Sequence, residues 1–365
     1  MFLLIENKSY HDKVKIKKLH IKNFKSLVDL EIVEPNPFTV FVGANGVGKS
    51  NIFEALEFAK ANISYTDLST KIDPSRLNNP VSINIPTDLI GIIERQFGGR
   101  DSFLNFSSIE KEFVYECNYD SVGSSLNLDY TKVPTDYFVN LPIHPNNWDV
   151  SIYQKFYNNF SRLFIGRDEL NKLEALKLAD SSKALITSCR NLERVLGRLL
   201  LDDIKKEEIL DWLKLFVPEF VNIEVRSDDV KGTDELRIYE KGSNKPFHKK
   251  LISDGTYNIL CLLTAVFQSD EPQFLCIDEP ENGLNPFVIK ELVNLFRTAC
   301  LEKKHYIWVN THSQSLVEML TPDEIVLVDK KNGNTEITQI QKMNLHGLPM
   351  DEAWISGALG GGVPW

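Results

Sequence analysis

Apolar and polar residues alternate along the first part of the chain in the pattern typical of β-strands. Residues 13–33 alternate in this way, with a one-residue slip of the apolar phase at Lys17-Lys18 and a polar turn over Asn23–Ser26. The slip predicts a β-bulge, and the turn predicts a return strand over Val28–Val33. Residues 110–130 alternate again, which predicts an antiparallel hairpin lying on the sheet.

Helical periodicity appears within residues 151–220, where we expect a helical lobe. Apolar residues that recur at steps of three and four predict one amphipathic helix. They are Leu185, Cys189, Leu192, Leu196 and Leu199. A second helix is expected over Ile204–Phe216, because Pro218 follows it. Val221–Val225 and Leu236–Tyr239 then predict a hairpin.

One short apolar run leads directly into a glycine-rich turn. Phe38–Val42 has the composition of a buried strand, Gly43-x4-Gly48-Lys49-Ser50 follows it, and residues 51–60 form an apolar, helix-forming run. This spacing fits the Walker A pattern, whose glycines let backbone N–H groups converge on an anion at a helix N-terminus. Lys49 is then expected to reach the β- and γ-phosphates, and Ser50 to bind Mg²⁺.

Two further apolar runs end in residues that carry chemistry. Phe274–Glu279 predicts a buried strand that ends in two acids, and Tyr306–Ser313 predicts one that ends at His312. In a nucleotide-binding protein the acids form a Walker B motif: Asp278 holds Mg²⁺ through water, and Glu279 orients and deprotonates the attacking water. Acids at a strand end are also common as plain caps, but their order after Walker A favours the functional interpretation.

A fourth motif stands before a long apolar helix expected over Ile259–Phe267. Here Ser253-Asp254-Gly255-Thr256 has two interpretations, and the residues leave both open. Ser253 is either a plain helix N-cap, or the cap of a helix whose N-terminus also binds an anion.

The opening of the chain resembles the RecF, SMC and OLD-type ATPases, an ABC-class group that acts on DNA or in phage defence. Two segments carry the resemblance, Leu19–Ser26 and Gly43–Asn51. It implies that the nucleotide is bound by Asn45, Gly46, Gly48, Lys49, Ser50 and Asn51. It also implies a glutamine that senses Mg²⁺ and the attacking water, for which Gln96 is the best-placed candidate; the alternative is a solvated loop residue.

The second half of the chain carries the remaining motifs of this resemblance. Ser253 and Gly255 stand where an ABC signature keeps its serine and second glycine, and in this class that serine binds the γ-phosphate held by the other subunit. Pro280–Pro286 resembles the D-loop, and His312 resembles the switch histidine that contacts the γ-phosphate. The resemblance therefore implies a homodimer, or a higher even-numbered oligomer, that closes around ATP and Mg²⁺.

These elements predict an α/β fold, and the resemblance implies a P-loop ABC-type ATPase with a mixed central sheet, an antiparallel β-subdomain and an inserted helical lobe. No run of heptads is long enough for a coiled-coil arm. We expect an N-terminal ATPase lobe over residues 1–150, the helical lobe over 151–220, a C-terminal ATPase lobe over 221–345 and a Gly-rich tail over 346–365. The tail either packs on the core or serves as an interaction segment.

Composition narrows the setting of the protein. The 365 residues carry a net charge of −10, which argues against a basic surface for nucleic acid along the whole chain. DNA binding in a local groove stays possible, because the lysines of residues 13–33 either contact phosphates or form the solvated face of an edge strand. Five scattered cysteines without a CxxC pair favour a reduced, cytoplasmic setting. No signal-peptide core or transmembrane run is visible, so no membrane partner is expected.

The function we expect is ATP binding and slow hydrolysis that switches the state of a dimer. The chain also resembles compact ATPases of anti-phage systems of the RloA/AbiL, PARIS and Septu types, and this resemblance implies pairing with a separate effector such as a Toprim or HNH nuclease. Three alternatives remain: a RecF-like DNA-repair ATPase, a transporter subunit and a non-hydrolysing scaffold. The missing LSGGQ form speaks against the transporter, and the intact Glu279 speaks against the scaffold.

Overall fold

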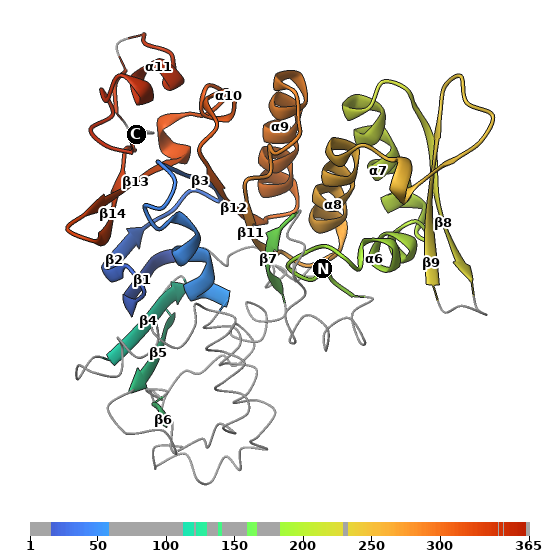
Figure 1. The fold of residues 1–365 in the computed structure, drawn as a ribbon. Coiled ribbons are helices and arrows are strands. Elements are labelled where there is room, and N and C mark those ends of the chain that lie inside the picture. Colours follow the sequence, from blue (N-terminus) through green and yellow to red (C-terminus); the bar gives the residue numbers. More distant parts are fainter. Residues whose placement is uncertain are drawn as a thin grey trace, which may run out of the picture.

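The computed structural model describes the chain over residues 16–57, 112–119, 122–129, 138–140, 159–165, 183–228, 233–341, 343–345 and 347–362. Three sheets and the helices that cover them make up this part of the chain (Figure 1). Gln96 lies outside the described residues, so its role stays a prediction.

A six-stranded mixed sheet forms the centre, which confirms the expected fold class. Its strands, in spatial order, are β14 (Asn334–Gln339), β13 (Ile325–Lys331), β3 (Phe38–Val42), β12 (Tyr306–Thr311), β11 (Phe274–Asp278) and β7 (Phe160–Phe164). Only the β13–β14 pair is antiparallel. The four inner strands are almost wholly buried on both faces, as parallel strands require.

The register of this sheet decides where the site lies. Asp278 pairs with Asn310 on one side and with Phe164 on the other, and Thr311 pairs with Val42. The carboxyl ends of β3, β12, β11 and β7 therefore meet at one edge of the sheet. This edge is the place where open α/β sheets bind ligands.

An antiparallel sheet stands beside the central one, as expected. Its strands are β2 (Leu27–Val33), β1 (Ile16–Phe24), β4 (Glu112–Tyr119), β5 (Val122–Asp129) and β6 (Phe138–Asn140). The pairing of β1 with β4 shifts register between Ile16 and Lys18, which confirms the slip in the hydrophobic pattern.

The helical lobe consists of α6 (Leu192–Leu199), α7 (Asp203–Phe216) and the β8–β9 hairpin, Phe220–Asp228 and Thr233–Glu240. The first helix is shorter than its apolar stripe predicts. The Asn191 side chain accepts from the Ile186 amide (3.0 Å) and donates to the Ala184 carbonyl (2.9 Å), which fixes the preceding segment as a loop. Leu185 and Cys189 are still buried in the core.

One strand lies inside the range assigned to the helical lobe. Phe160–Phe164 pairs in parallel with β11 and forms β7, so this part of residues 151–220 belongs to the central sheet. Phe160 packs edge-on against Phe274, with ring centroids 5.5 Å apart. Five residues that include Ser161 and Arg162 are too few for periodicity to separate strand from helix. The remaining lobe boundaries stay a prediction.

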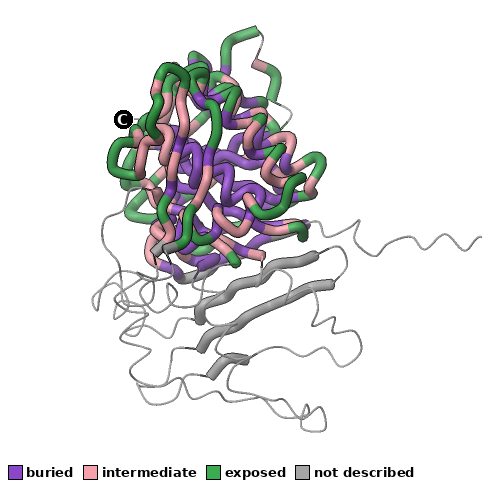
Figure 2. Tube along the Cα trace, turned by 90° about the vertical axis from the view of Figure 1, so that its right-hand side faces the viewer, coloured by how far each residue is buried: buried purple, intermediate pink, exposed green. Residues whose placement is uncertain are grey.

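Two long helices pack against the sheet and the lobe. They are α8 (Asp254–Phe267), which follows the short strand β10 (Phe247–His248) and the 3-10 turn η2 (Lys249–Leu251), and α9 (Pro286–Glu302). Figure 2 shows buried residues concentrated in the interior of this body. No helix of the described ranges has both the length and the apolar character that crossing a membrane demands.

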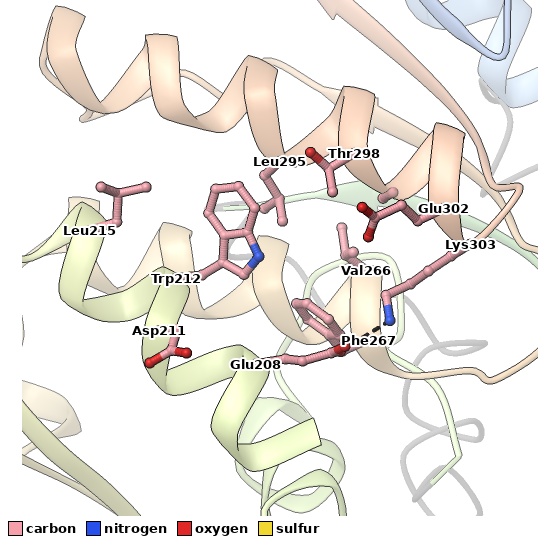
Figure 3. Close-up of a pocket in the computed structure, with 11 residues that line it drawn as sticks. Glu208, Asp211, Trp212, Leu215, Val266, Phe267, Leu295, Thr298, Glu302 and Lys303 are labelled. Carbon is pink, nitrogen blue, oxygen red and sulfur yellow. Dashed lines mark hydrogen bonds and ion pairs between the residues drawn. The ribbon is translucent and has the colours of Figure 1, made fainter. Parts of the chain in front are cut away.

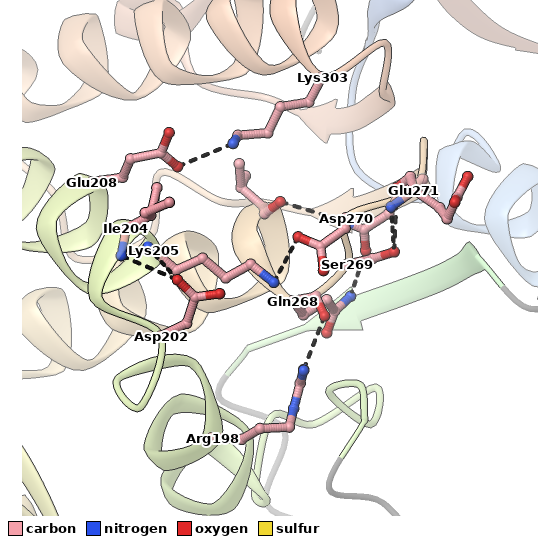
Figure 4. A network of polar contacts seen from close by, with 12 residues as sticks. Arg198, Asp202, Ile204, Lys205, Glu208, Gln268, Ser269, Asp270, Glu271 and Lys303 are labelled. Carbon is pink, nitrogen blue, oxygen red and sulfur yellow. Dashed lines mark hydrogen bonds and ion pairs between the residues drawn. The ribbon is translucent and has the colours of Figure 1, made fainter. Parts of the chain in front are cut away.

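Polar contacts fasten the lobe to the end of α8 (Figure 4). The Arg198 guanidinium donates to the Gln268 carbonyl (2.9 Å), and the Lys205 ammonium lies 2.7 Å from Asp270. The Asp202 carboxylate caps α7 by accepting from the Ile204 and Lys205 amides. The lobe and α8 are thus joined by side chains at the surface as well as by the apolar core.

The described part of the C-terminal tail packs back on the core. After α10 (Gln314–Val317) and the 3-10 turn η3 (Pro322–Glu324), helix α11 (Met350–Ile355) buries Trp354, whose indole N–H donates to the Gly362 carbonyl. The Gly362 amide donates to the Asp329 carboxylate on β13 (2.8 and 2.9 Å). Of the two interpretations left open, packing on the core is the one the structure supports.

Candidate functional site

A polar pocket of about 290 Å³ opens at the carboxyl edge of the central sheet. Its lining comes from the turn after β3, the start of the helix over residues 49–57, and the ends of β7, β11 and β12. The lining residues are Asn45, Gly46, Gly48, Lys49, Ser50, Asn51, Phe164, Asp278, Glu279 and Asn310. The structure therefore brings the predicted Walker A and Walker B residues to one cavity.

The glycines of the turn are needed for its shape. Gly46 and Gly48 adopt φ of +79° and +106°, a region that side chains rarely tolerate. A Cβ on Gly48 would lie 2.1 Å from the Thr335 hydroxyl and 2.7 Å from that of Ser26. The phosphate loop is thus pressed against β14 and the β1–β2 turn.

Asn51 stabilises this loop through a chain of hydrogen bonds. Its side-chain amide donates to the Ser26 hydroxyl (2.8 Å), which is hydrogen-bonded to the Thr335 hydroxyl (2.6 Å). The Thr335 hydroxyl in turn donates to the carbonyl of Val47 (2.8 Å). The β1–β2 turn and β14 therefore fix the backbone of the loop, a contribution that the local motif does not reveal.

Lys49 supplies a buried cation at the pocket. Its ammonium donates to the Gly43 and Ala44 carbonyls (2.6 and 2.8 Å), and the residue is only 7% exposed. Burial lowers the pKa of Lys49, while Glu279, Glu281 and Asp278 act in the opposite direction. Because its hydrogen-bond partners are neutral carbonyls, the ammonium keeps a charge to offer to an anion.

Ser50 and Asp278 fit a hard divalent cation. The Ser50 hydroxyl donates to Asp278 Oδ1 (3.1 Å), so a hydroxyl and a carboxylate oxygen meet at the pocket. Asn310 Nδ2 donates to the same carboxylate oxygen (2.7 Å), while its own Oδ1 is buried without a partner among the described residues. No group of three metal-binding side chains occurs in the described ranges. Mg²⁺ suits such a site, because it takes few protein ligands and completes its shell with water and phosphate.

Glu279 and His312 meet beside this cation site. His312 Nδ1 lies 3.1 Å from Glu279 Oε1, and Asn282 Nδ2 donates to Glu279 Oε2 (3.0 Å). Both side chains are partly exposed; Glu279 lines the pocket, and His312 lies behind it in contact with its carboxylate. The structure thus joins the two residues for which the sequence predicts catalytic roles.

Glu281 is a buried carboxyl that the sequence reasoning did not single out. The Thr311 hydroxyl donates to its Oε1, and its Oε2 has no partner in the described part of the chain. Burial raises the pKa of Glu281 to about 7, with Glu279 adding to the effect and Thr311 and Lys49 opposing it. In the sequence it is marked only by its place two residues after Glu279, within the segment that resembles the D-loop.

Comparison with known proteins assigns the family. Residues 38–318 match the family described as "AAA domain, putative AbiEii toxin, Type IV TA system", a span that runs from β3 to the segment after His312. The chain belongs to this family. This membership makes the chain an AAA-family ATPase, and its fold resembles that of an SMC head domain.

Individual relatives agree with the family at lower similarity. The chain is 31% identical over 119 residues to the chromosome partition protein Smc of Methanocaldococcus jannaschii. This match covers 27% of this chain and only 10% of that protein. It is 20% identical over 349 residues to an ATP/GTP phosphatase of Helicobacter pylori, covering 85% and 88% of the two chains. The Smc head domain bound to ScpA from Pyrococcus furiosus shares the fold, with a TM-score of 0.51, 14% identity and coverage of 89% and 96%.

Arg162 is a residue of this AAA-family chain that the sequence motifs missed. From β7 its guanidinium reaches Asp278 (3.0 Å), Glu57 (3.2 Å) and Glu54 (3.5 Å). Burial opposes its charge, but Asp278, Glu57 and Glu54 together raise the pKa of Arg162 above its ordinary value. The guanidinium thus fixes the carboxylate that is predicted to hold Mg²⁺. No motif marks it, because it lies on the strand that the periodicity did not reveal.

Ser253 and Gly255 lie at the start of α8. The Ser253 hydroxyl accepts from the Thr256 amide (3.1 Å), which confirms the helix cap. Neither residue lines the pocket of its own chain in the described structure. A Cβ on Gly255 would lie 2.6 Å from the Gly283 carbonyl, which gives this glycine a packing reason as well. Binding of a phosphate from a second chain stays a prediction.

Proposed function

We propose that this AAA-family protein binds ATP with Mg²⁺ in the pocket at the sheet edge and hydrolyses it to ADP and phosphate. One observation carries the proposal: a single cavity unites Lys49, Ser50, Asp278 and Glu279, and Glu279 in turn contacts His312. The phosphates lie on the N-terminus of the helix over residues 49–57, where the amides and Lys49 bind them. The name of the Helicobacter pylori relative, an ATP/GTP phosphatase, supports the same chemistry.

In this proposal each polar residue of the cavity has one task. Ser50 and Asp278 hold Mg²⁺, which when bound neutralises charge on the phosphate oxygens. Glu279 orients the attacking water and takes its proton, and Asn282 keeps the Glu279 carboxylate in place. His312 contacts the γ-phosphate from the end of β12.

Two chains close around two nucleotides in the active state that we propose. Ser253 and the N-terminus of α8 of each chain bind the γ-phosphate held by the other. This arrangement explains why the exposed Ser253 does not line the pocket of its own chain. ATP binding then favours the dimer, and hydrolysis releases it.

The proposed biological role is that of a switch for a separate effector, such as a Toprim or HNH nuclease, in anti-phage defence. The family description names a putative toxin of a toxin–antitoxin system, and this supports a role in defence against phage. The test is phage plating on cells that carry the chain with its neighbouring gene, comparing wild type with Glu279→Gln. Protection by the wild type alone supports the role. Equal plating on both, together with hydrolysis that DNA stimulates, would instead favour a DNA-repair ATPase.

Phosphate release from the purified chain tests the chemistry. We expect Mg²⁺-dependent release from ATP that falls at least about a hundredfold in Glu279→Gln, which keeps the shape but removes the base. His312→Ala should also slow release while it retains nucleotide binding. No release from the wild type, or full release from Glu279→Gln, would refute the assignment.

A further inference from the structure

Asn258 is a buried polar residue on α8 that no motif of the nucleotide site includes. It is 4% exposed and belongs to a helix whose buried residues are otherwise apolar, apart from Thr264. Its side-chain amide donates to the Pro280 carbonyl (2.9 Å) and to the Asn282 carbonyl (2.8 Å). A single side chain thus binds the backbone carbonyls on both sides of Glu281. These carbonyls belong to the turn that directly follows Glu279.

The turn that Asn258 holds contains an unusual backbone. Glu279 adopts φ of +48° and Gly283 adopts φ of +76°. A non-glycine residue in this region is strained, and such strain persists only where the surroundings fix it. Within the turn, the Asn282 amide donates to the Glu279 carbonyl (3.2 Å), and its side chain donates to the Glu279 carboxylate (3.0 Å). The conformation of Glu279 therefore depends on the placement of Asn282.

The start of α8 touches the same turn at a second point. A Cβ on Gly255 would lie only 2.6 Å from the Gly283 carbonyl. The two backbones are therefore in direct contact. Hydrogen bonds from Asn258 and this close contact together join the first two turns of α8 to the 279–283 turn. A displacement of one is therefore transmitted to the other.

We propose that Asn258 is a positioning residue that holds Glu279 in its productive conformation through Asn282. This inference rests on the proposed function, in which Glu279 activates water. Because Ser253 caps the same helix, the link also carries the state of the Ser253 contact to Glu279. Burying an apolar side chain at this position would cost less free energy than burying an asparagine. The two hydrogen bonds that Asn258 donates are therefore the physical reason for an asparagine here.

The first test is the steady-state kinetics of Asn258→Ala. We expect kcat to fall about ten- to a hundredfold, because the carboxylate loses its alignment, while KM for ATP stays within about twofold. Asn191→Ala is the matched control: Asn191 is 6% exposed, also makes two hydrogen bonds to backbone groups, and lies in the helical lobe. It should lose comparable stability and keep kcat within about twofold of the wild type.

A second variant tests the same link if Asn258→Ala folds poorly. Asn282 is exposed, so Asn282→Ala removes the other end of the link without opening the core. It should lower kcat by a similar factor. The double variant should lose much less than the product of the two single losses, as residues in one chain of contacts do.

Three results would overturn the inference: an unchanged kcat in Asn258→Ala, a loss shared by Asn191→Ala, or losses that multiply in the double variant. A wild type that releases no phosphate would instead refute the proposed function itself. Adding Asn258→Ala to Glu279→Gln separates the two further, because ATP-dependent dimer mass should stay unchanged in that background.

Discussion

Two hollows of similar size differ in how they hold charge. The pocket at the sheet edge measures about 290 Å³, and a groove between α7, α8 and α9 measures about 340 Å³. In the pocket, Lys49 and Asp278 are 7% and 3% exposed. In the groove, Figure 3 shows Trp212 and Phe267 beside the paired side chains of Glu208 and Lys303.

The charged side chains of the groove are exposed to water. The Lys303 ammonium lies 3.0 Å from Glu208 and 4.8 Å from the Phe267 ring centroid, and both charged side chains are at least one-third exposed. Charges at such a rim change stability little, whereas buried charges are expensive to hold. Size therefore does not mark the site. What marks it is charge that the fold retains in its interior.

Replacing the lysine in each hollow should give the largest contrast. We expect Lys49→Ala to lower ATP affinity and phosphate release at least about a hundredfold, because the buried cation faces the phosphates. Lys303→Ala should leave both within about twofold. Binding of a fluorescent ATP analogue and phosphate release measure the difference. Equal effects of the two changes would break the distinction.

Removing the arginine beside the pocket should have the next largest effect, now on stability. Arg162→Met leaves Asp278, Glu57 and Glu54 without their shared cation. We expect the free energy of unfolding to fall by about 3–5 kcal/mol, the range for breaking a buried ion pair from one side. Urea unfolding at neutral pH measures it. A fall below about 1 kcal/mol would mean that water reaches these carboxylates.

Two buried titratable groups should make stability depend on pH in opposite directions. Burial raises the pKa of Glu281 from 4.5 to about 7, so the folded chain binds the extra proton and stability falls as pH rises through this window. Burial lowers the pKa of His305 from 6.5 to about 4, so the unfolded chain binds more protons and stability falls as pH drops through that window.

Single substitutions should separate these opposed effects, each of about 3 kcal/mol. Glu281→Gln should remove the decline between pH 4.5 and about 7, and His305→Gln should remove the decline between 6.5 and about 4. Urea unfolding across this range measures both. Parallel pH profiles for wild type and Glu281→Gln would show that the carboxyl is solvated in the folded chain.

The smallest effect belongs to the groove. Glu208→Gln removes an exposed pair with Lys303, and we expect a change in unfolding free energy below about 1 kcal/mol with unchanged phosphate release. Thermal unfolding and the release assay measure it. A loss of release in this variant would give the groove a role in the chemistry.

Local patterns predicted much of the pocket, and non-local contacts explain what they missed. Gly43–Ser50, Asp278 and His312 each stand at the end of an apolar run, so strand, turn and ligand residue are adjacent in the chain. Arg162 reaches the pocket from β7, 116 residues away from Asp278, where no local pattern points to it. The loop ahead of α6 likewise depends on the Asn191 side chain, which overrides the apolar stripe.

The proposed function depends on ATP closing two chains around a shared site. Light scattering of Glu279→Gln with and without ATP and Mg²⁺ tests it most directly, with the exposed Ser253 changed to Arg as a second variant in the same background. We expect ATP to double the mass of Glu279→Gln, and Ser253→Arg to abolish the doubling while nucleotide stays bound. A chain that binds ATP and keeps the mass of one subunit would contradict it.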